Sequence, residues 1–480
     1  MILLPIGFTI LLATIFLTRS ASSTDLTEHV RNAATWLGGA EEPLEPFDAA
    51  LVLNHAEPQD SLHSQLKPDV RYITSLSYGG HANQFIGIQN LLYLAKILNR
   101  VAIVPTLTPL HFKGLPQDMS KFYDIERFYQ ETSIPLVELS KFKWWNFEKP
   151  PPVEPLTCWS VLENVADGRN VNDGSMAVHN IDVKYYPLPP LTRADDRGKL
   201  WFESIHDFDS DWWSRQQWID KVRKERLPHV KSSDDATNDT EPETKPGFDV
   251  THNEPPTDQT FCLDTTFFFG SRMFPPAFPP SRPVEALREY EGHGWIEAGQ
   301  HLGFSNHLED LADLYLRRLF DVSKVKNIPP FITVHIRRGD FATERGLTSL
   351  DKYTDAVQRV REKLNWRIDN PDGWEGPGKG MERYRKGYRG EDYAVVVATD
   401  EAPTSDFVKT LKNDLGWKVI DHDFMQTEKE MGEWYPLLID SAILARGGGF
   451  VGTEWSTFSY LAALRVKYWN GGVQDWTPSP

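Results

Sequence analysis

Apolar and polar residues are arranged in blocks along the chain, and the first clear block has a strand–helix–strand pattern. A short extended run at residues 70–76 is followed by a glycine turn and then by residues 84–98, where apolar side chains recur at helical spacing. A β-branched run at residues 101–104 comes directly afterwards. This order predicts a βαβ unit, and therefore a parallel sheet.

A second series of such elements occupies the C-terminal part of the chain. A predicted helix over residues 307–322 precedes a continuous apolar strand at residues 331–336. The fold class predicted by the two series is α/β, with two Rossmann-like domains that face each other across a cleft; open parallel sheets bind ligands at the carboxyl ends of their strands. The further expected strands are 393–398, 418–421 and 450–451, and the further expected helices are 407–411, 435–444 and 456–465.

These blocks also set the expected domain boundaries. The N-terminal domain is predicted at residues 69–305 and the C-terminal domain at residues 306–480. Residues 24–68 are mixed and polar, which favours a stem or an N-terminal cap. Within the first domain, residues 231–260 are rich in Asp, Glu, Pro, Thr and Asn, so a disordered acidic insert is expected there.

The first 23 residues indicate the compartment. Residues 2–17 are almost uninterrupted apolar sequence, and Arg19 and small residues follow, which is typical of a signal peptide ending near Ala21 or of a short signal-anchor. The run is short for a bilayer-spanning helix, which needs roughly 20 residues, and a buried core segment is the alternative. We expect the protein to be located in the lumen of the endoplasmic reticulum or Golgi. Either a single-pass anchor or secretion is compatible with this N-terminus, and we expect the protein to contact the membrane only through it.

Charge and cysteine content narrow the function classes. The chain has 68 acidic and 51 basic residues and a formal net charge of −17, which argues against nonspecific nucleic-acid binding. The two cysteines, Cys158 and Cys262, either form one disulfide in an oxidising lumen or remain buried free thiols. Asn238 begins an N-glycosylation sequon inside the acidic tract.

The first candidate site is the glycine turn from Tyr78 to Gln84. Gly79 and Gly80 allow a close approach of the backbone to a ligand, and the helix that follows presents free N–H groups to an anion. A turn that only reverses the chain is the simpler interpretation.

The second candidate site, His335 to Phe341, places two adjacent arginines at the end of a buried strand. Alternate strand residues share a face, so His335 and Arg337 are expected to project together. Guanidinium groups bind phosphate oxygens bidentately, which suits a diphosphate. A surface charge cluster with a salt bridge to Asp340 is the alternative.

Two further clusters follow later strands. Asp400 is expected either to accept hydrogen bonds from a sugar or a nucleobase, or to cap a helix. Residues 447–459 bring glycines and hydroxyl groups to a strand–helix turn and form another candidate anion site. No P-loop, dinucleotide fingerprint or metal-type His/Cys/Asp spacing is present in the sequence, so no metal site is predicted.

Together, these blocks resemble the GDP-fucose protein O-fucosyltransferase-like superfamily, in a fungal-type branch. The resemblance implies the glycosyltransferase B arrangement, with the acceptor on the side of the N-terminal domain and the nucleotide sugar on the C-terminal domain. It further implies inverting transfer of fucose from GDP-fucose to a hydroxyl of a protein or glycan acceptor, with no essential metal or other cofactor. It rests on Gly79-Gly80-x-x-Asn83-Gln84 and the helix after it, on His335 to Phe341, and on Gly452 to Ser459.

The resemblance also implies roles for individual residues. Arg337 matches the family's arginine that binds the β-phosphate, where it would neutralise the charge developing on the leaving GDP. His335 would contact the nucleotide sugar, and Asp400 is a looser candidate for guanine recognition. The remaining expected contacts are Ser456, Thr457 and Phe458 with the phosphates and ribose, and Gly79, Gly80, His81, Ala82 and Asn83 with the fucose and the acceptor, whose hydroxyl Asn83 would position.

The glycine turn departs from the family patterns. Some members have an arginine and an aromatic residue where this chain has His81 and Ala82, and others have a glutamate base there, which this turn lacks. His81 with a pKa near neutral is one candidate base, and late proton transfer without a base is the alternative. Two other functions stay open: a transferase for a different nucleotide sugar, and a non-catalytic glycan- or GDP-binding protein on the same fold.

Overall fold

A computed structural model of the chain describes residues 46–160, 171–172, 174–189, 202–226, 254–269, 292–344, 346–370 and 387–477. The expected signal sequence, most of the expected acidic insert and Asn238 lie outside the described residues. Within the described ranges, no helix combines the length and the apolar character needed to cross a bilayer.

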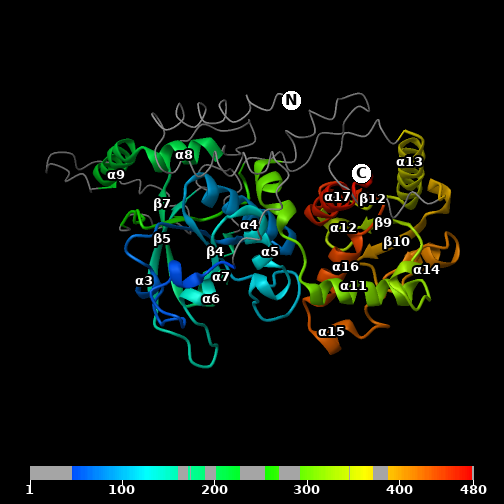
Figure 1. The fold of residues 1–480 in the computed structure, drawn as a ribbon, viewed down its shortest axis with the longest axis horizontal. Helices are drawn as coiled ribbons and strands as arrows, with labels where there is room; N and C mark the ends of the chain where they lie inside the picture. The colour runs from blue at the N-terminus through cyan, green and yellow to red at the C-terminus, as the bar shows by residue number, and fades with distance from the viewer. Residues whose placement is uncertain are drawn as a thin grey trace, which may run out of the picture. The chain divides into compact units, whose positions relative to one another are not determined.

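Six parallel strands form the sheet of the N-terminal lobe, in the order β4-β3-β1-β8-β5-β7. Figure 1 labels three of them, β4, β5 and β7, in the part of the ribbon coloured blue to green. The predicted βαβ unit is present, because α4 (His81–Ile97) connects β1 to its parallel neighbour β3. The strands are β1 (Tyr72–Ser75), β3 (Val101–Val104), β4 (Leu136–Glu138), β5 (Glu154–Ser160), β7 (Ile181–Pro187) and β8 (Thr260–Leu263), and a separate antiparallel pair is formed by β2 (Ser77–Tyr78) and β6 (Val171–Asn172).

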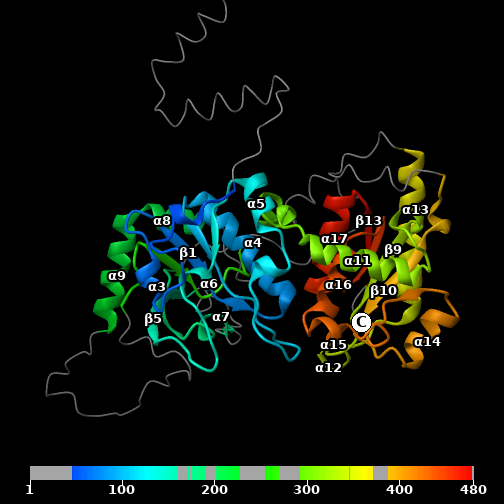
Figure 2. The same ribbon diagram turned by 60° about the horizontal axis from the view of Figure 1, so that its bottom comes forward.

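Side chains of this sheet alternate between two apolar cores. Helix α4 packs against β1 and β3 (Figure 2). Ile73 belongs to the core on the side of α4, whereas Tyr72 belongs to the other core. The core on the α4 side also contains residues of α8 (Phe202–Ser210) and α9 (Trp212–Arg226), and the opposite core contains residues of α3 (Leu62–Gln65), α6 (Leu139–Phe142) and α7 (Gly174–Ala177). Val52, Leu53, Leu62 and Leu66 are buried in that second core, so the described part of residues 46–68 packs on the sheet.

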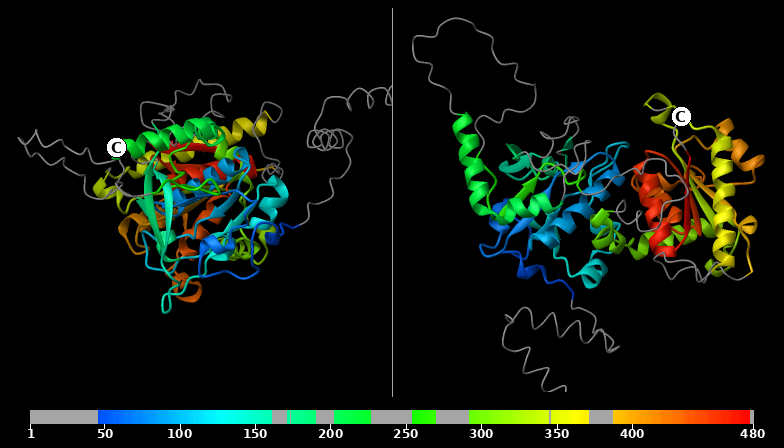
Figure 3. Two further views of the ribbon diagram at one scale, coloured as in Figure 1. Left: turned by 90° about the vertical axis from the view of Figure 1, so that its left-hand side faces the viewer. Right: turned by 90° about the horizontal axis from the view of Figure 1, so that it is seen from above.

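Five parallel strands form the sheet of the C-terminal lobe, in the order β11-β10-β9-β12-β13. Figure 3 shows the yellow α13 and the red α17 on opposite sides of these strands. The strands are β9 (Phe331–Ile336), β10 (Ala394–Thr399), β11 (Lys418–Val419), β12 (Gly449–Thr453) and β13 (Val473–Thr477). The helices are α13 (Leu350–Asp369) and α14 (Asp406–Asn413) on one side, and α11 (Asn306–Leu319), α16 (Tyr435–Leu444) and α17 (Thr457–Asn470) on the other.

The prediction of an α/β fold with parallel sheets is therefore confirmed. The sequence pattern did not identify α13, β13 or the strands β4, β5, β7 and β8. The other short helices are α5 (Ile125–Thr132), α12 (Phe341–Glu344), α15 (Thr427–Met431), η1 (Ala49–Leu51), η2 (Met119–Lys121), η4 (Gly299–His301), η5 (Val325–Asn327) and η8 (Gly390–Asp392).

The range predicted for the disordered acidic insert, residues 231–260, extends too far at its C-terminal end. Thr260 is the first residue of β8 and is buried beside β1. Just before it, Asp258 accepts hydrogen bonds from Arg100 and Arg215, whose guanidinium groups also bind the buried Asp209. These ion pairs compensate the charges of the segment, so its last residues belong to the folded lobe.

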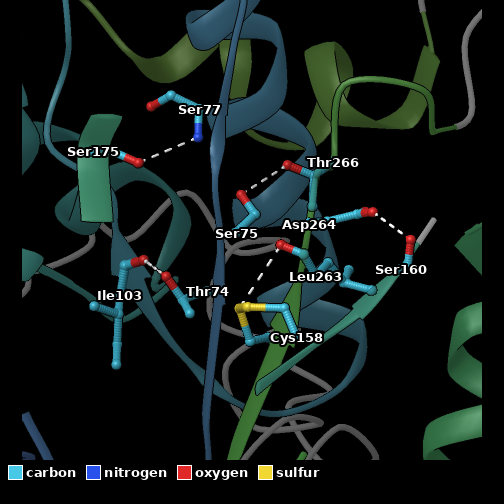
Figure 4. The surroundings of a disulfide bond; sticks show 11 residues. Thr74, Ser75, Ser77, Ile103, Cys158, Ser160, Ser175, Leu263, Asp264 and Thr266 are labelled. Carbon is cyan, nitrogen blue, oxygen red and sulfur yellow. Dashed lines mark hydrogen bonds between the residues drawn. A yellow bond between two sulfur atoms is a disulfide. The ribbon is translucent and has the colours of Figure 1, made fainter. Parts of the chain in front are cut away.

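A disulfide joins Cys158 of β5 to Cys262 of β8, with the two Cα atoms 4.4 Å apart. Figure 4 shows this bond beside polar side chains where β1, β5 and β8 end, among them Ser75, Ser160 and Asp264. The alternative of two free thiols is therefore not what the structure has.

Candidate functional site

His335 lies near the carboxyl end of β9 and faces α17. Its Nδ1 atom is 2.7 Å from the hydroxyl of Ser459, and its ring centre is 4.9 Å from that of Phe458. Burial lowers the pKa of His335 to about 3, with the positive charge of Arg337 acting in the same direction and Asp400 opposing it. His335 is therefore neutral near pH 7 and offers hydrogen bonds, not charge.

Thr453, the last residue of β12, fixes the backbone at the end of β9. Its hydroxyl donates to the carbonyl oxygen of His335 (3.0 Å) and accepts from the backbone N–H of Arg337 (3.1 Å). The buried hydroxyl of Tyr353 on α13 lies 2.7 Å from the hydroxyl oxygen of Thr453. The hydroxyl of Ser459 accepts from the N–H of Thr453 at 3.1 Å. Sequence reasoning placed Thr453 and Ser459 within a candidate cluster without a role, and nothing in the sequence pointed to Tyr353.

Two carboxylates hold the guanidinium group of Arg337. One nitrogen is 2.9 Å from Asp340 and the other is 2.9 Å from Asp400, and 28% of the side chain is exposed. The salt bridge to Asp340, expected as the alternative to a functional role, is present. It still leaves part of the cation accessible from solvent.

Asp400 has a role in the structure that the sequence did not predict. Its two carboxylate oxygens accept hydrogen bonds from the backbone N–H groups of Arg338 (2.8 Å) and Gly339 (3.0 Å), in addition to the ion pair with Arg337. The helix-cap alternative is wrong, because α14 begins later and is capped by the hydroxyl of Ser405. Asp400 therefore fixes the loop that carries Arg337, while guanine recognition stays a prediction.

Arg338 binds away from Arg337. Its guanidinium pairs with Glu401 and lies 4.1 Å from the ring centre of Phe407. The next residue, Gly339, has no room for a side chain, since a Cβ atom there would lie 2.7 Å from a carboxylate oxygen of Asp400. These contacts keep Arg338 occupied and leave Arg337 as the more accessible cation.

The N-terminus of α17 lies beside this strand end, as the contact of Phe458 with His335 shows. Ser456 is the N-cap, and its hydroxyl accepts from the N–H of Ser459 at 3.2 Å. Thr457 and Phe458 are half-buried and form the first turn, whose N–H groups have no acceptor within an α-helix. The predicted residues Ser456, Thr457, Phe458, His335, Arg337 and Asp400 are thus brought together, in an arrangement that suits an anion.

The glycine turn of the N-terminal lobe leads into α4. Gly79 has φ +62°, and a Cβ atom there would lie 2.4 Å from the amide nitrogen of Asn83, so the Asn83 side chain lies over the turn. Gly80 is the N-cap of α4, and a Cβ atom on it would lie 2.7 Å from the imidazole of His111. The side chain of Ala82 is buried in the apolar core, and its expected contact with a substrate stays a prediction.

The proposal of His81 as a base with a near-neutral pKa is wrong. Its Nε2 atom is 3.0 Å from the hydroxyl of Tyr123, and its ring lies against those of Tyr123 and Trp434. Burial lowers the pKa of His81 to about 3, and the nearby Arg465 lowers it further. An imidazole this weakly basic and this deeply buried holds the turn in place and does not take protons near neutral pH.

The two clusters are connected through helices α4 and α17. Arg465 of α17 is fully buried, with its guanidinium carbon 4.8 Å from the ring centre of Phe85 on α4 and 4.6 Å from that of Phe304. Its NH1 group donates to the hydroxyl of Ser441 at 2.5 Å. Among the described residues, no hydrogen bond or ion pair joins the glycine turn directly to Arg337.

Other features of the described residues do not coincide with these clusters. No group of three or more His, Cys, Asp or Glu side chains there is placed to hold a metal ion. A cavity of about 480 Å³ adjoins the edge strand β11 and contains none of the predicted site residues; its lining includes Tyr315, Trp417, Arg318, Lys412 and Lys418.

Parallel sheets with a guanidinium group and a helix N-terminus at the strand ends are typical of proteins that bind phosphorylated ligands. The chain belongs to the GDP-fucose protein O-fucosyltransferase family, whose model matches residues 72–468. It is therefore a fucosyltransferase that uses GDP-fucose, and a different nucleotide sugar or a non-catalytic role is not favoured.

Among solved structures, the chain is similar to POFUT1 in complex with GDP-fucose, with 13% identity over 86% of this chain and 99% of that chain and a TM-score of 0.43. It is also similar to the fucosyltransferase NodZ from Bradyrhizobium, with 12% identity over 83% of this chain and 94% of that chain and a TM-score of 0.32. No curated protein matches the sequence. The family assignment rests on the family match, because these structural similarities are low.

Proposed function

We propose that the protein transfers fucose with inversion from GDP-fucose to a hydroxyl group of a protein or glycan acceptor, and that Arg337 stabilises the leaving GDP. One observation carries the assignment of Arg337. Its guanidinium lies at the carboxyl end of β9, partly exposed, on a loop whose backbone is fixed by Thr453 and Asp400.

The chemistry follows from the charges involved. The acceptor oxygen attacks C1 of fucose while the bond from C1 to the β-phosphate oxygen breaks, so GDP leaves with the bonding electrons. A positioned cation at that oxygen stabilises the transition state more than the ground state, which raises the rate. The first-turn N–H groups of α17 add further donors for the diphosphate. Neutral His335 contributes a hydrogen bond without adding charge.

Replacement of Arg337 tests this role. Arg337→Ala should lower turnover by roughly 10²- to 10³-fold, the usual cost of removing one such donor, while the melting temperature stays close to that of the wild type. Turnover is measured as GDP released from GDP-fucose and as labelled fucose incorporated into a pool of Ser/Thr peptides and desialylated glycopeptides. Arg338→Ala is the matched control, because that arginine pairs with Glu401 and should affect turnover far less. Near-normal turnover of Arg337→Ala would refute the proposal that Arg337 stabilises the leaving GDP.

The fine specificity for the donor has its own test. Thermal-shift titrations compare GDP-fucose with GDP-mannose and UDP-sugars, since a ligand that binds the native state raises the melting temperature. GDP-fucose should give the largest shift. A larger shift with another nucleotide sugar would contradict the proposed donor.

We propose that the reaction needs no metal. The cation at the leaving group is then supplied by Arg337, so turnover in excess EDTA should equal turnover in buffer. A loss of activity that added Mg²⁺ or Mn²⁺ restores would contradict this proposal.

We also propose that the protein works in the lumen of the secretory pathway. The disulfide between Cys158 and Cys262 supports an oxidising compartment, and the apolar N-terminus supports entry into it. Sequencing the N-terminus of the mature protein separates a cleaved signal, with a start near residue 22, from a retained anchor. A mature protein that keeps residue 1 and is fully digested by protease acting on the cytosolic side of the membrane would contradict a location in the lumen.

A further inference from the structure

The proposed transfer releases a proton from the acceptor hydroxyl, and buried His81 cannot accept it near neutral pH. We infer that His111 is the group that takes this proton. The inference rests on the proposed function, since it assumes that the acceptor hydroxyl meets the donor at the glycine turn.

His111 lies against the glycine turn although 31 positions separate it in sequence from Gly80. A Cβ atom placed on Gly80 would lie 2.7 Å from Cδ2 and 2.9 Å from Nε2 of the imidazole. The missing side chain of Gly80 therefore creates the space that the imidazole edge occupies. Gly80 is also the N-cap of α4, whose first turn carries Asn83, the residue expected to position the acceptor hydroxyl.

The loop that carries His111 is fixed to the glycine motif. The side chain of Gln84 accepts from the backbone N–H of Thr108 (3.0 Å) and donates to the carbonyl oxygen of Thr108 (2.7 Å). A second bond from the same amide group reaches the carbonyl oxygen of Gly79 (2.9 Å). Gln84 thus joins the turn and the loop, so His111 is placed relative to the turn by hydrogen bonds and not only by contact.

The far side of the loop is also fixed. Leu107 and Gln117 exchange two backbone hydrogen bonds of 2.8 and 2.9 Å, which close the base of the loop. The indole of Trp434 donates to the carbonyl oxygen of Leu115 at 2.8 Å and packs edge-on against Phe112. Trp434 also contacts His81, so one side chain orders both the loop and the turn.

His111 has the chemistry that the turn lacks. Its side chain is exposed, whereas His81 is buried and Asn83 cannot take up a proton. An accessible imidazole nitrogen can act as a general base. In the proposed step the acceptor O–H bond breaks, its proton moves to Nε2 of His111, the oxygen bonds to C1 of fucose, and GDP leaves with the electrons of the broken C1–O bond. The imidazolium then returns its proton to water.

Two variants of His111 test the inference. His111→Ala and His111→Gln should each lower turnover by roughly 10²- to 10⁴-fold, the usual contribution of a general base, and glutamine should not restore it because it cannot take the proton. Binding of GDP, measured by calorimetry, and the melting temperature should stay unchanged. Added imidazole should restore turnover of His111→Ala in proportion to its concentration. The assays are GDP release with water as the acceptor and fucose incorporation into the peptide and glycopeptide pool.

Two controls separate the outcomes. His55→Ala removes another exposed histidine of the same lobe, on the segment between η1 and α3, and should leave turnover unchanged. Glu433→Gln removes a carboxylate whose Cβ atom approaches the same loop near Gly114. Full activity of His111→Ala, restoration by glutamine, or a large loss in Glu433→Gln alone would each overturn the inference. Absence of fucose transfer by the wild type would instead refute the proposed function itself.

Discussion

Three buried histidines should make the protein sensitive to mild acid. Burial lowers the pKa of His81 and His335 to about 3 and that of His179 to about 4, while an unfolded histidine titrates near 6.5. Between these values the unfolded chain binds more protons than the native one. The stability from these residues is therefore complete above pH 6.5 and is lost as the pH falls toward the folded-state pKa values.

The expected magnitude follows from the window between pH 6.5 and pH 5. One pH unit corresponds to about 1.4 kcal/mol for each differing proton, so each histidine costs about 2 kcal/mol at pH 5 and the three together cost about 6 kcal/mol. Total stabilities are commonly 5–15 kcal/mol, so this loss is a large fraction of the free energy of unfolding at pH 5. His422 acts in the opposite direction, because Asp440 raises its pKa against the effect of burial, and its contribution falls as the pH rises.

His179→Gln isolates one of these protons away from both clusters. The imidazole lies 2.8 Å from the hydroxyl of Thr106 and 2.5 Å from the carbonyl oxygen of Lys143, and a glutamine amide has the donor and acceptor for both partners. Urea unfolding followed by tryptophan fluorescence at pH 7, 6 and 5 gives the free energies of unfolding. The variant should lose about 2 kcal/mol less than the wild type between pH 7 and pH 5. An equal pH dependence in the two proteins would refute this account of His179.

Three further changes have specific expected outcomes. Tyr353→Phe removes the hydroxyl that bonds Thr453 and should lower the free energy of unfolding by about 1–2 kcal/mol in urea titrations at pH 7; an unchanged value would remove the tyrosine from the network. Asp340→Asn removes a competitor for Arg337 and should tighten GDP binding severalfold by calorimetry, whereas weaker binding would show that Asp340 assists the ligand. Cys158→Ser should cost about 2–4 kcal/mol and abolish the effect of dithiothreitol on the melting temperature; a remaining effect would point to another reducible group.

Sequence patterns located the elements whose burial is visible locally. β9 agrees with its prediction at both ends, because residues 331–336 are buried on both faces and form one continuous apolar run. α16 also agrees, at residues 435–444. α13 was recoverable but was not predicted: Tyr353, Val357, Val360 and Leu364 recur at intervals of three or four and are all buried.

Other elements depend on distant partners, so no local pattern defines them. β8 has only four residues and follows the acidic tract, yet it pairs with β1, which lies nearly 190 positions earlier in sequence. The burial of His81 depends in the same way on Tyr123 and Trp434. The sequence indicates the residue types at the site but not which of them are buried, so it does not distinguish buried His81 from exposed His111.

The loop after β9 explains how an arginine can be both ion-paired and functional. Asp400 is fixed, because both of its oxygens accept backbone hydrogen bonds from the loop in addition to the ion pair. Within the part of the chain that the structure describes, the carboxylate of Asp340 accepts no backbone hydrogen bond, and 37% of its side chain is exposed, against 25% for Asp400. Under the proposed function, an incoming diphosphate would exchange with Asp340 while Asp400 keeps Arg337 in place. On this account the salt bridge to Asp340 neutralises the cation until GDP-fucose binds, so the two interpretations that the sequence left open describe two states of the same site.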